Sequence, residues 1–485
     1  MHPTTKQPEE ILANKPHQLG EFWIGGVKNT WDISISDFQS VAKRLGFCLY
    51  RGDIHQIQDG YKLSKSTEAE FFNSMRNYIE DVGQVNFKGI IDVCERFMQK
   101  SGVYVIKRLP EIKREQLLND TKDYCYKFFQ NGFVKITPKD FTLIDYKLFP
   151  KDKFVLENKI APREFNPQIK LDPSAKYLSF LKKATDWDTN EAYIKSVIGY
   201  LCHEYKDETM GYIIVLTEQC ADPKDGGGSG KNLFCNLLSH ATSYHSKNGS
   251  QVKYDEKFFQ SWNGERIMGV SDVLKNFNYI FLKEPSTGTF ILKKLFKNEV
   301  EIPVQDGPKF IIQTNYSYET SDAGLNRRII PIEFTDFFTK QGGVDTYFKC
   351  HFPLDWTQDD WADYHIILIE SIKIWLQMLS EKKKIKPVTL SQTGWEKQFE
   401  IAFTKLVFEF IETNWEGWVK SIEVETHDIQ EALKSHYNLN DVDSKFRASP
   451  QKVSAAIKEY AKYQQYSCDN KGVKEGKKYY KFIKL

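Results

Sequence analysis

The chain has 485 residues, of which 41% are hydrophobic and 27% are charged, and its formal net charge is +2 at pH 7. This length exceeds what one hydrophobic core usually serves and excludes a single compact domain in favour of roughly two to four. The composition excludes a largely disordered chain. The near-neutral charge means that an argument for nucleic-acid binding has to come from local basic patches.

Cysteine spacing and the lengths of the apolar runs indicate in which cellular compartment the protein resides. The eight cysteines form no Cys-x-x-Cys pair and have no nearby histidine at zinc spacing, so we expect buried thiols in a reducing environment. They are Cys48, Cys94, Cys125, Cys202, Cys220, Cys235, Cys350 and Cys468. No run approaches the roughly 20 apolar residues that cross a bilayer, and the first residues are polar. These features predict a cytoplasmic protein with no membrane partner.

The first part of the chain, residues 1–172, mixes two patterns. Residues 47–50 and 103–107 are short aromatic and β-branched runs, whereas residues 68–79 have the apolar spacing of an amphipathic helix. We predict an N-terminal α+β domain that serves DNA binding or assembly. It has no Asp-x-Asp strand that would suggest primase chemistry.

The middle of the chain changes from helical to α/β. Residues 173–205 have apolar side chains at helical spacing, which predicts a helical collar or linker. Within residues 206–380, the apolar run 212–216 precedes a glycine cluster and the helix-like residues 233–238. Further apolar runs predict strands of the same sheet at residues 267–270, 310–313 and 329–334. Residues 364–379 have the spacing of a long helix.

The last predicted domain, residues 390–485, is basic. Residues 395–412 and 450–463 are helix-like, and residues 471–483 predict a small hairpin. Lysines dominate from residue 447 onward, where Lys452, Lys458, Lys462, Lys471, Lys474, Lys477, Lys478, Lys481 and Lys484 face only Glu459, Asp469 and Glu475. This pattern predicts a winged-helix-like domain that binds DNA, and a solubilising tail is the alternative.

The glycine cluster resembles a Walker A loop, in which backbone N–H groups surround phosphates and a lysine bridges them. The candidate nucleotide-binding residues are Gly226, Gly227, Gly228, Ser229, Gly230, Lys231, Asn232 and Leu233. Asp225 stands where the motif usually has its first glycine, and Asn232 where it usually has a magnesium-binding Ser or Thr. The alternative, a flexible surface loop, does not explain Gly-Lys between a strand and a helix start.

Three downstream positions fit the rest of a nucleotide-hydrolysing site. Asp272 is the acidic residue at the end of one predicted strand, where a Walker B acid is expected. Asn315 ends the next, a placement that can aim its amide at the attacking water or the γ-phosphate. Arg327 and Arg328 precede another strand, where one can reach a neighbouring subunit's γ-phosphate. Taken singly, these residues are an acidic turn, a strand cap and surface arginines.

With these four motifs in this order, residues 175–380 resemble the superfamily 3 helicases, a branch of the AAA+ ATPases. The resemblance is strongest to primase-helicases of bacteriophages and Bacteroidetes mobile elements. It implies an ATPase site shared between subunits, with Lys231, Asp272, Asn315 and either Arg327 or Arg328 as catalytic residues. It also implies ATP and Mg²⁺ as cofactors, with Asn232 and Asp272 at the metal.

In this family, a hairpin between the second and third motifs holds single-stranded DNA in the central channel. The matching segment is residues 290–304, where Lys293, Lys294, Phe296 and Lys297 would bind the DNA backbone and stack on bases. A solvated lysine-rich turn is the alternative.

The resemblance therefore implies an ATP-dependent DNA helicase or translocase that replicates a phage or mobile element in a bacterial cytoplasm. The implied partners are single-stranded and forked DNA, identical subunits in a hexameric ring, and other replication proteins; the implied polarity is 3′ to 5′. A different class stays open, because Asn232 replaces a hydroxyl residue and Ser271 stands where many relatives carry an acid. That class is a hydrolysis-impaired ring that binds nucleotide and DNA and marks an origin or loads partners.

Overall fold

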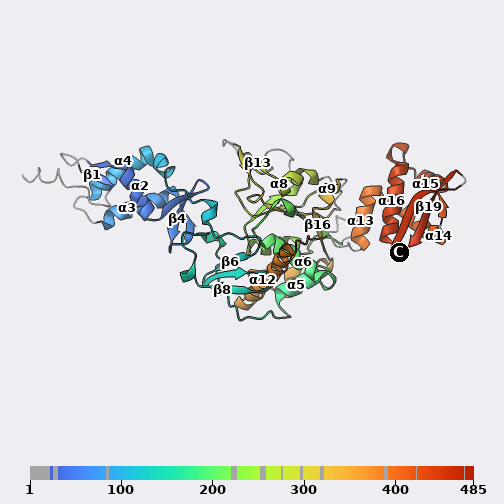
Figure 1. Ribbon diagram of the computed structural model, residues 1–485, viewed down its shortest axis with the longest axis horizontal. Coiled ribbons are helices and arrows are strands. Elements are labelled where there is room, and N and C mark those ends of the chain that lie inside the picture. The colour runs from blue at the N-terminus through green and yellow to red at the C-terminus, as the bar shows by residue number, and fades with distance from the viewer. Residues whose placement is uncertain are drawn as a thin grey trace, which may run out of the picture. The chain divides into compact units, whose positions relative to one another are not determined.

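The computed structural model describes residues 22–25, 31–82, 87–219, 227–251, 258–274, 277–294, 299–316, 322–386, 392–421, 423–474 and 476–485. The chain divides into two compact units, Met1–Gln168 and Ile169–Leu485 (Figure 1). None of the helices in these ranges combines the length and the apolar character that a membrane crossing requires. The finer division into a collar, an ATPase domain and a C-terminal domain stays a prediction.

The first unit mixes helices and small sheets, as expected for an α+β domain. Its helices are α2 (Ile35–Arg44), α3 (Glu68–Asp81) and α4 (Phe87–Ile106). Its strands are β1 (Trp23–Gly25), β2 (Trp31–Ile33), β3 (Phe47–Tyr50), β4 (Asp53–Gln58), β5 (Lys62–Lys65), β6 (Cys125–Phe129), β7 (Gly132–Ile136), β8 (Phe141–Ile144) and β9 (Val155–Leu156). They form sheets in the orders β1-β2, β3-β4-β5-β9 and β6-β7-β8.

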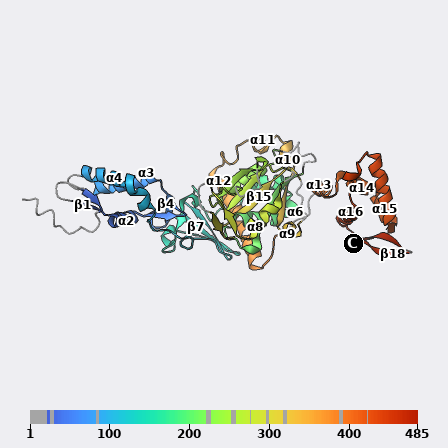
Figure 2. The same cartoon turned by 90° about the horizontal axis from the view of Figure 1, so that it is seen from above.

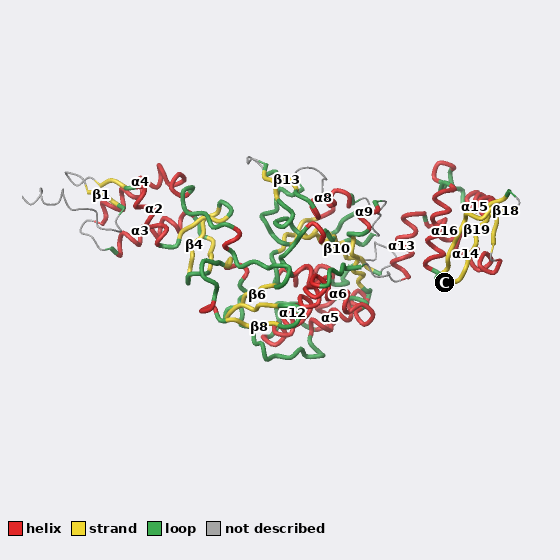
Figure 3. Tube along the Cα trace, in the orientation of Figure 1, coloured by secondary structure: helices red, strands yellow, loops and turns green. Residues whose placement is uncertain are grey.

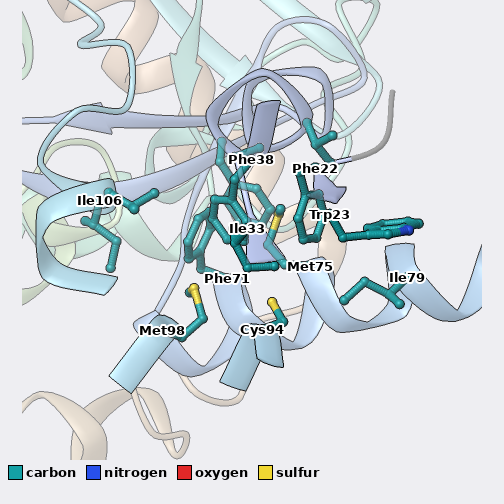
Figure 4. Packing of buried hydrophobic residues seen from close by; sticks show 14 of the residues in the cluster. Phe22, Trp23, Ile33, Phe38, Phe71, Met75, Ile79, Cys94, Met98 and Ile106 are labelled. Carbon is teal, nitrogen blue, oxygen red and sulfur yellow. The ribbon is translucent and has the colours of Figure 1, made fainter. Parts of the chain in front are cut away.

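Aromatic and sulfur-containing side chains fill the core between α2, α3 and α4. Figure 4 shows Phe38, Phe71 and Met75 of α2 and α3 gathered with Met98 and Cys94 of α4. All of these side chains are buried, so this small unit removes much of its aromatic surface from water.

The short run at residues 103–107 corrects one expectation. Its β-branched residues suggested an extended segment, but residues 103–106 form the last turn of α4. Val105 and Ile106 are buried there in the same cluster as Ile90, Ile91 and Cys94. A 20-residue helix with one apolar face therefore overrides the local preference of a few β-branched side chains.

A five-stranded parallel sheet is the centre of the second unit. Its strands are β10 (Ile213–Glu218), β11 (Tyr244–Asn248), β12 (Ile267–Ser271), β15 (Lys309–Gln313) and β16 (Ile329–Phe334). The order is β11-β12-β15-β10-β16, and every neighbouring pair is parallel, so β15 lies in the middle of the sheet (Figure 2). The expected strands β10, β12, β15 and β16 are confirmed. The polar strand β11 was not anticipated.

Helices and one hairpin accompany this sheet. They are α5 (Lys176–Ala184), α6 (Trp187–Cys202), α7 (Lys231–Ser239), α8 (Lys283–Thr287), the hairpin β13 (Phe290–Leu292) and β14 (Val300–Ile302), α9 (Ala323–Asn326), α10 (Phe337–Lys340), α11 (Val344–Phe348) and α12 (Gln358–Ser380). The helical segment expected in residues 173–205 is present as two helices, α5 and α6, and the long helix expected near residue 364 is confirmed as α12. Gly199 lets α6 and α12 cross closely, because a Cβ there would lie 2.1 Å from the carbonyl oxygen of Ser371.

The last part of the second unit has its own buried aromatic cluster. It contains α13 (Gln392–Phe403), α14 (Lys405–Ser421), β17 (Glu423–Glu425), α15 (Thr426–Leu439), α16 (Pro450–Tyr463), β18 (Tyr466–Lys474) and β19 (Lys477–Lys484). Figure 3 shows these helices in red beside the antiparallel strands β18 and β19 in yellow, and β17 completes the sheet as β17-β19-β18. The expected hairpin and the helix at residues 450–463 are confirmed. The helical segment at 395–412 is divided at Thr404, whose φ is +83°.

Candidate nucleotide site

The described part of the glycine loop, residues 227–230, leads into α7 through backbone that favours glycine. Gly227, Gly228 and Gly230 have φ values of +139°, +75° and +100°. A Cβ on Gly230 would also lie 2.7 Å from Cε2 of Phe180 on α5. The glycine at this position is therefore required twice, by its left-handed backbone and by close packing. Gly226 and Asp225 lie outside the described residues.

Lys231 begins α7, and its ammonium group points to the carboxyl edge of the sheet. Its Nζ lies 2.6 Å from Oδ1 of Asn315 and also donates to Oε1 of Glu218. Asn315 follows β15, which pairs with β10 from Ile213 with Phe310 to Leu216 with Gln313. Because β10 and β15 are parallel, the loop after one strand and the residue after the other meet at the same edge. The structure thus brings together two of the predicted site residues.

Glu218 is a member of this cluster that the sequence analysis missed. It is the last residue of β10, and its side chain is buried. Its Oε1 accepts from Ser229 Oγ at 2.6 Å, and its Oε2 accepts from the backbone N–H of Gly227 at 3.1 Å. The available signal was the step from an apolar run to Thr217 and Glu218 just before the glycines, since a carboxylate at the end of a buried strand needs a partner.

Opposing effects set the protonation of Glu218. Burial raises the pKa of its carboxyl group. The charge of Lys231 and the hydrogen bonds from Lys231, Ser229 and Gly227 lower this pKa by more than burial raises it. The net result is a pKa below the ordinary value of a glutamate. Glu218 is therefore a carboxylate at neutral pH, paired with the Lys231 ammonium in a buried position.

Asp272 and Ser271 lie at the end of β12, at the same edge of the sheet. Asp272 is exposed and has a φ of +52°, so its carboxylate stands in the turn that follows the strand. That turn is tied to β15, because Val273 N–H donates to the Gln313 carbonyl at 3.1 Å and Thr314 Oγ1 donates to the Val273 carbonyl at 3.1 Å. These two hydrogen bonds hold the turn that contains Asp272 beside the end of β15, which Asn315 follows.

The oxygen donors at this edge suit Mg²⁺ by their chemistry. Asn232 is exposed in the first turn of α7, and Ser271 and Asp272 end β12. Magnesium is usually held by one or two carboxylates together with substrate phosphates and water rather than by a complete protein cage. The described residues contain no group of three or more His, Cys, Asp or Glu side chains placed to hold a metal by themselves.

The two candidate arginines differ in their surroundings. Arg328 is half-buried, and its Nη1 donates to the carbonyl oxygen of Lys283 at 2.9 Å. Arg327 is exposed at the end of α9. The helix itself is anchored by Asp322, which caps it and lies 2.8 Å from Lys283 Nζ. Arg327 is thus the more exposed of the two arginines.

The hairpin exists as β13 and β14, paired from Phe290 with Ile302 to Leu292 with Val300. Lys293 forms an ion pair with Glu299 at 2.8 Å, and Lys294 Nζ donates to Asn263 Oδ1 at 2.6 Å. The other two predicted DNA-binding residues, Phe296 and Lys297, lie outside the described residues. Lys293 and Lys294, which follow β13 at the turn end of the hairpin, therefore have partners within the chain.

Residues after β16 contact the glycine loop and the helix beside it. Thr339 of α10 donates from Oγ1 to the carbonyl of Gly227 at 2.7 Å. Phe338 is buried against Phe180, with ring centroids 5.7 Å apart. Neither residue belongs to a motif that the sequence revealed, because their role comes from the return of the chain towards the loop.

The basic C-terminal surface is divided between a helix and a strand. Lys452, Lys458 and Lys462 are exposed on α16. On β19, Lys477 and Lys481 pair with Glu425 and Glu423 of β17, at 2.9 and 3.8 Å. The count of charges from residue 447 onward therefore left out Glu423 and Glu425, which neutralise two lysines of β19. The lysines of α16 are less neutralised than these two.

Comparison with known proteins gives structural similarities at low sequence identity. No protein-family model and no curated protein sequence matches the chain. The A-form apo structure of the NrS-1 C-terminal region (residues 305–718) has 16% identity and a TM-score of 0.32, and the match covers 74% of this chain and 96% of that one. A second A-form apo structure of this region has 16% identity and a TM-score of 0.33, with 75% and 97% covered. A full-length MCM homologue from Methanopyrus kandleri has 10% identity and a TM-score of 0.19, with 67% of each chain covered. Similarity at this level does not establish a family.

Proposed function

We propose that the chain is an ATP-dependent DNA helicase or translocase of the superfamily 3 type. The observation that carries this proposal is the 2.6 Å contact between Lys231 Nζ and Asn315 Oδ1 at the carboxyl edge of a parallel sheet. Open parallel sheets bind ligands at this edge, and a lysine at a glycine loop followed by a helix is suited to phosphate groups. An arrangement of this kind supports nucleotide hydrolysis better than binding alone, because Asn315 adds a polar group that can orient water.

In the proposed mechanism, Lys231 and the backbone N–H groups of the loop bind the phosphates of ATP. Asn315 orients the attacking water, and Asn232 and Asp272 hold Mg²⁺. When bound, Mg²⁺ would neutralise charge on the phosphate oxygens. Arg327, exposed at the end of α9, would complete the site of the neighbouring subunit, so the active form would be a ring.

DNA contacts would come from two regions. The β13–β14 hairpin carries Lys293 and Lys294, which would exchange their contacts with Glu299 and Asn263 for DNA phosphates. The order α14, β17, α15, α16, β18, β19 is that of a winged helix, in which α16 would be the recognition helix. A hexameric ring, movement from 3′ to 5′ and a role in phage or mobile-element replication complete the proposal.

The test is Mg²⁺-dependent ATP hydrolysis by the full chain, with and without single-stranded DNA. DNA should stimulate hydrolysis, and Lys231→Ala should abolish it. Lys384→Ala is a matched control, since Lys384 is an exposed lysine outside the loop. Equal hydrolysis by the Lys231 and Lys384 variants would overturn the proposal.

The second candidate is a ring that binds nucleotide and DNA but hydrolyses ATP poorly. Asn232 and Ser271 favour it, because a hydroxyl and a carboxylate that commonly organise magnesium are replaced. The same assay separates the two candidates. ATP binding that depends on Lys231, without hydrolysis in any variant, would support the second.

A further inference from the structure

Glu218 occupies donors of the kind that the phosphate loop would offer to a nucleotide. The carboxylate accepts hydrogen bonds from the Gly227 N–H, the Ser229 hydroxyl and the Lys231 ammonium. A backbone N–H, a hydroxyl and a lysine at a helix start are also the donors that surround phosphates in such loops. One carboxylate therefore accepts hydrogen bonds from three groups of the kind that bind phosphate.

Burial strengthens the contact between Glu218 and Lys231. Its side chain and that of Lys231 are both buried, at 5% and 9% relative exposure. Charges attract each other more strongly in a buried site than in water, and a lysine held by one anion is less available to another. Nucleotide phosphate and the Glu218 carboxylate therefore compete for the same ammonium group.

We propose that Glu218 is an internal competitor of the nucleotide phosphates. Glu218 holds Lys231 and Ser229, and phosphate binding displaces it from both. Lys231 keeps its second contact, to Asn315 Oδ1. When phosphate leaves, Glu218 returns to Lys231, which weakens nucleotide affinity and speeds product release. This inference rests on the proposed function, because it assigns a positioning role at the same site.

Two other roles for Glu218 make opposite predictions. A carboxylate that bound magnesium would strengthen nucleotide binding only when the metal is present. A carboxylate with a purely structural role would, when replaced, lower stability and weaken nucleotide binding together. A competitor alone predicts that removing its charge tightens nucleotide binding without metal.

The experiment measures ADP binding to the full chain by calorimetry in EDTA and again with Mg²⁺. Glu218→Gln removes the charge and preserves the size of the side chain. In EDTA we expect it to bind ADP about tenfold more tightly than the parent, a difference of about 1.4 kcal/mol, and to release ADP more slowly. Glu208→Gln, an exposed glutamate in the same unit, should match the parent.

Equal or weaker binding by Glu218→Gln in EDTA would overturn the inference, and weaker binding only with Mg²⁺ would replace it by a metal-ligand role. If the unfolding midpoint of Glu218→Gln falls, Glu218→Asp provides the test. The Glu218→Asp variant, whose carboxylate is on a shorter side chain, should also bind ADP more tightly than the parent. Equal or weaker binding by this variant overturns the inference. The Lys231→Ala variant separates failure of the proposed phosphate site from failure of the competitor role. If Lys231→Ala binds ADP as well as the parent, the proposed phosphate site itself is wrong. If Lys231→Ala loses ADP binding but the Glu218 variants bind ADP as the parent does, only the competitor role is wrong.

Discussion

The Lys231 ammonium lies 2.6 Å from the amide oxygen of Asn315, although the two residues are 84 positions apart in the chain. The contact joins the start of α7 to the end of β15. It gives Asn315 a fixed orientation, with its Oδ1 on the lysine and its amide NH₂ group available for another acceptor.

Replacing Asn315 by Ala should separate binding from chemistry. We expect ADP affinity to change less than threefold, because Lys231 and the loop remain, and kcat to fall by about 10² or more, because the orienting amide is lost. The measurements are the Kd for ADP and steady-state ATP hydrolysis. Asn326→Ala, an exposed asparagine at the end of α9, is the control. A kcat equal to that of the parent would remove Asn315 from the mechanism.

The arginines should behave differently when each is replaced by Ala. Arg327→Ala should reduce kcat by about 10³ with ADP binding intact, the effect expected of an arginine finger. Arg328→Ala should lower the free energy of unfolding by about 1 kcal/mol, because its bond to the Lys283 carbonyl is lost.

Mixed rings provide the decisive control for Arg327. In the proposed ring, a subunit carrying Lys231→Ala would have no working site of its own but would donate an arginine to a neighbour that carries Arg327→Ala. Mixing the two inactive variants should therefore restore part of the hydrolysis. If the mixture stays as inactive as its components, Arg327 does not act between subunits.

Restoring a magnesium-binding hydroxyl should improve metal use. Asn232→Thr is expected to lower the Mg²⁺ concentration needed for half-maximal hydrolysis several-fold, because a hydroxyl at this position is the usual ligand. Ser271→Asp should act in the same direction by adding a carboxylate. A Mg²⁺ titration of ATP hydrolysis tests both changes. Hydrolysis that appears only in these variants would favour the hydrolysis-impaired ring.

Lys206 should make the stability of the second unit depend on pH. Its Nζ is buried and donates to the carbonyl of Pro308 at 2.8 Å and that of Pro285 at 3.3 Å. Burial, helped by the charge of Arg266, lowers the pKa of Lys206 to about 7 from its ordinary 10.5. Between these two values the unfolded chain binds more protons than the folded one, so the free energy of unfolding rises with pH in this window.

Lys206→Met removes this titration. Relative to the variant, the parent should gain on the order of 2 kcal/mol of stability between pH 7 and pH 9. Urea unfolding at both pH values measures the difference. Loss of the two hydrogen bonds also changes the stability of the variant, but by an amount that does not titrate. Parallel pH profiles would show that Lys206 keeps its proton in the folded chain up to its ordinary pKa.

The lysines of α16 should contribute to DNA affinity through phosphate contacts. Changing Lys452, Lys458 and Lys462 together to Ala should weaken DNA binding at low salt, and the slope of log K against log salt should fall by about 2 to 3. The matched control changes Lys477 and Lys481, which already pair with Glu425 and Glu423 and should matter less. Equal effects of the two sets would argue against α16 as the recognition helix.

The sequence by itself determined four of the five strands of the parallel sheet and the glycine-rich loop that precedes α7. Continuous apolar runs such as residues 213–216 and 310–312 are fully buried strands, and a glycine cluster followed by Lys231 begins a helix. These signals are local, because a buried strand needs apolar side chains on both faces and a tight loop needs glycine. Where a local signal competed with a longer one, as at residues 103–107, the helix periodicity of α4 decided the structure.

Only the tertiary structure decided which polar groups meet. Glu218 contacts Lys231 because the start of α7 lies beside the end of β10, and Asn315 joins them because β15 is placed beside β10. The same holds for Arg327 and Arg328, adjacent in sequence but distinguished by the Lys283 carbonyl that only Arg328 is seen to contact. Contacts between distant segments depend on strand order and chain reversal, which residue patterns along one sequence do not encode locally.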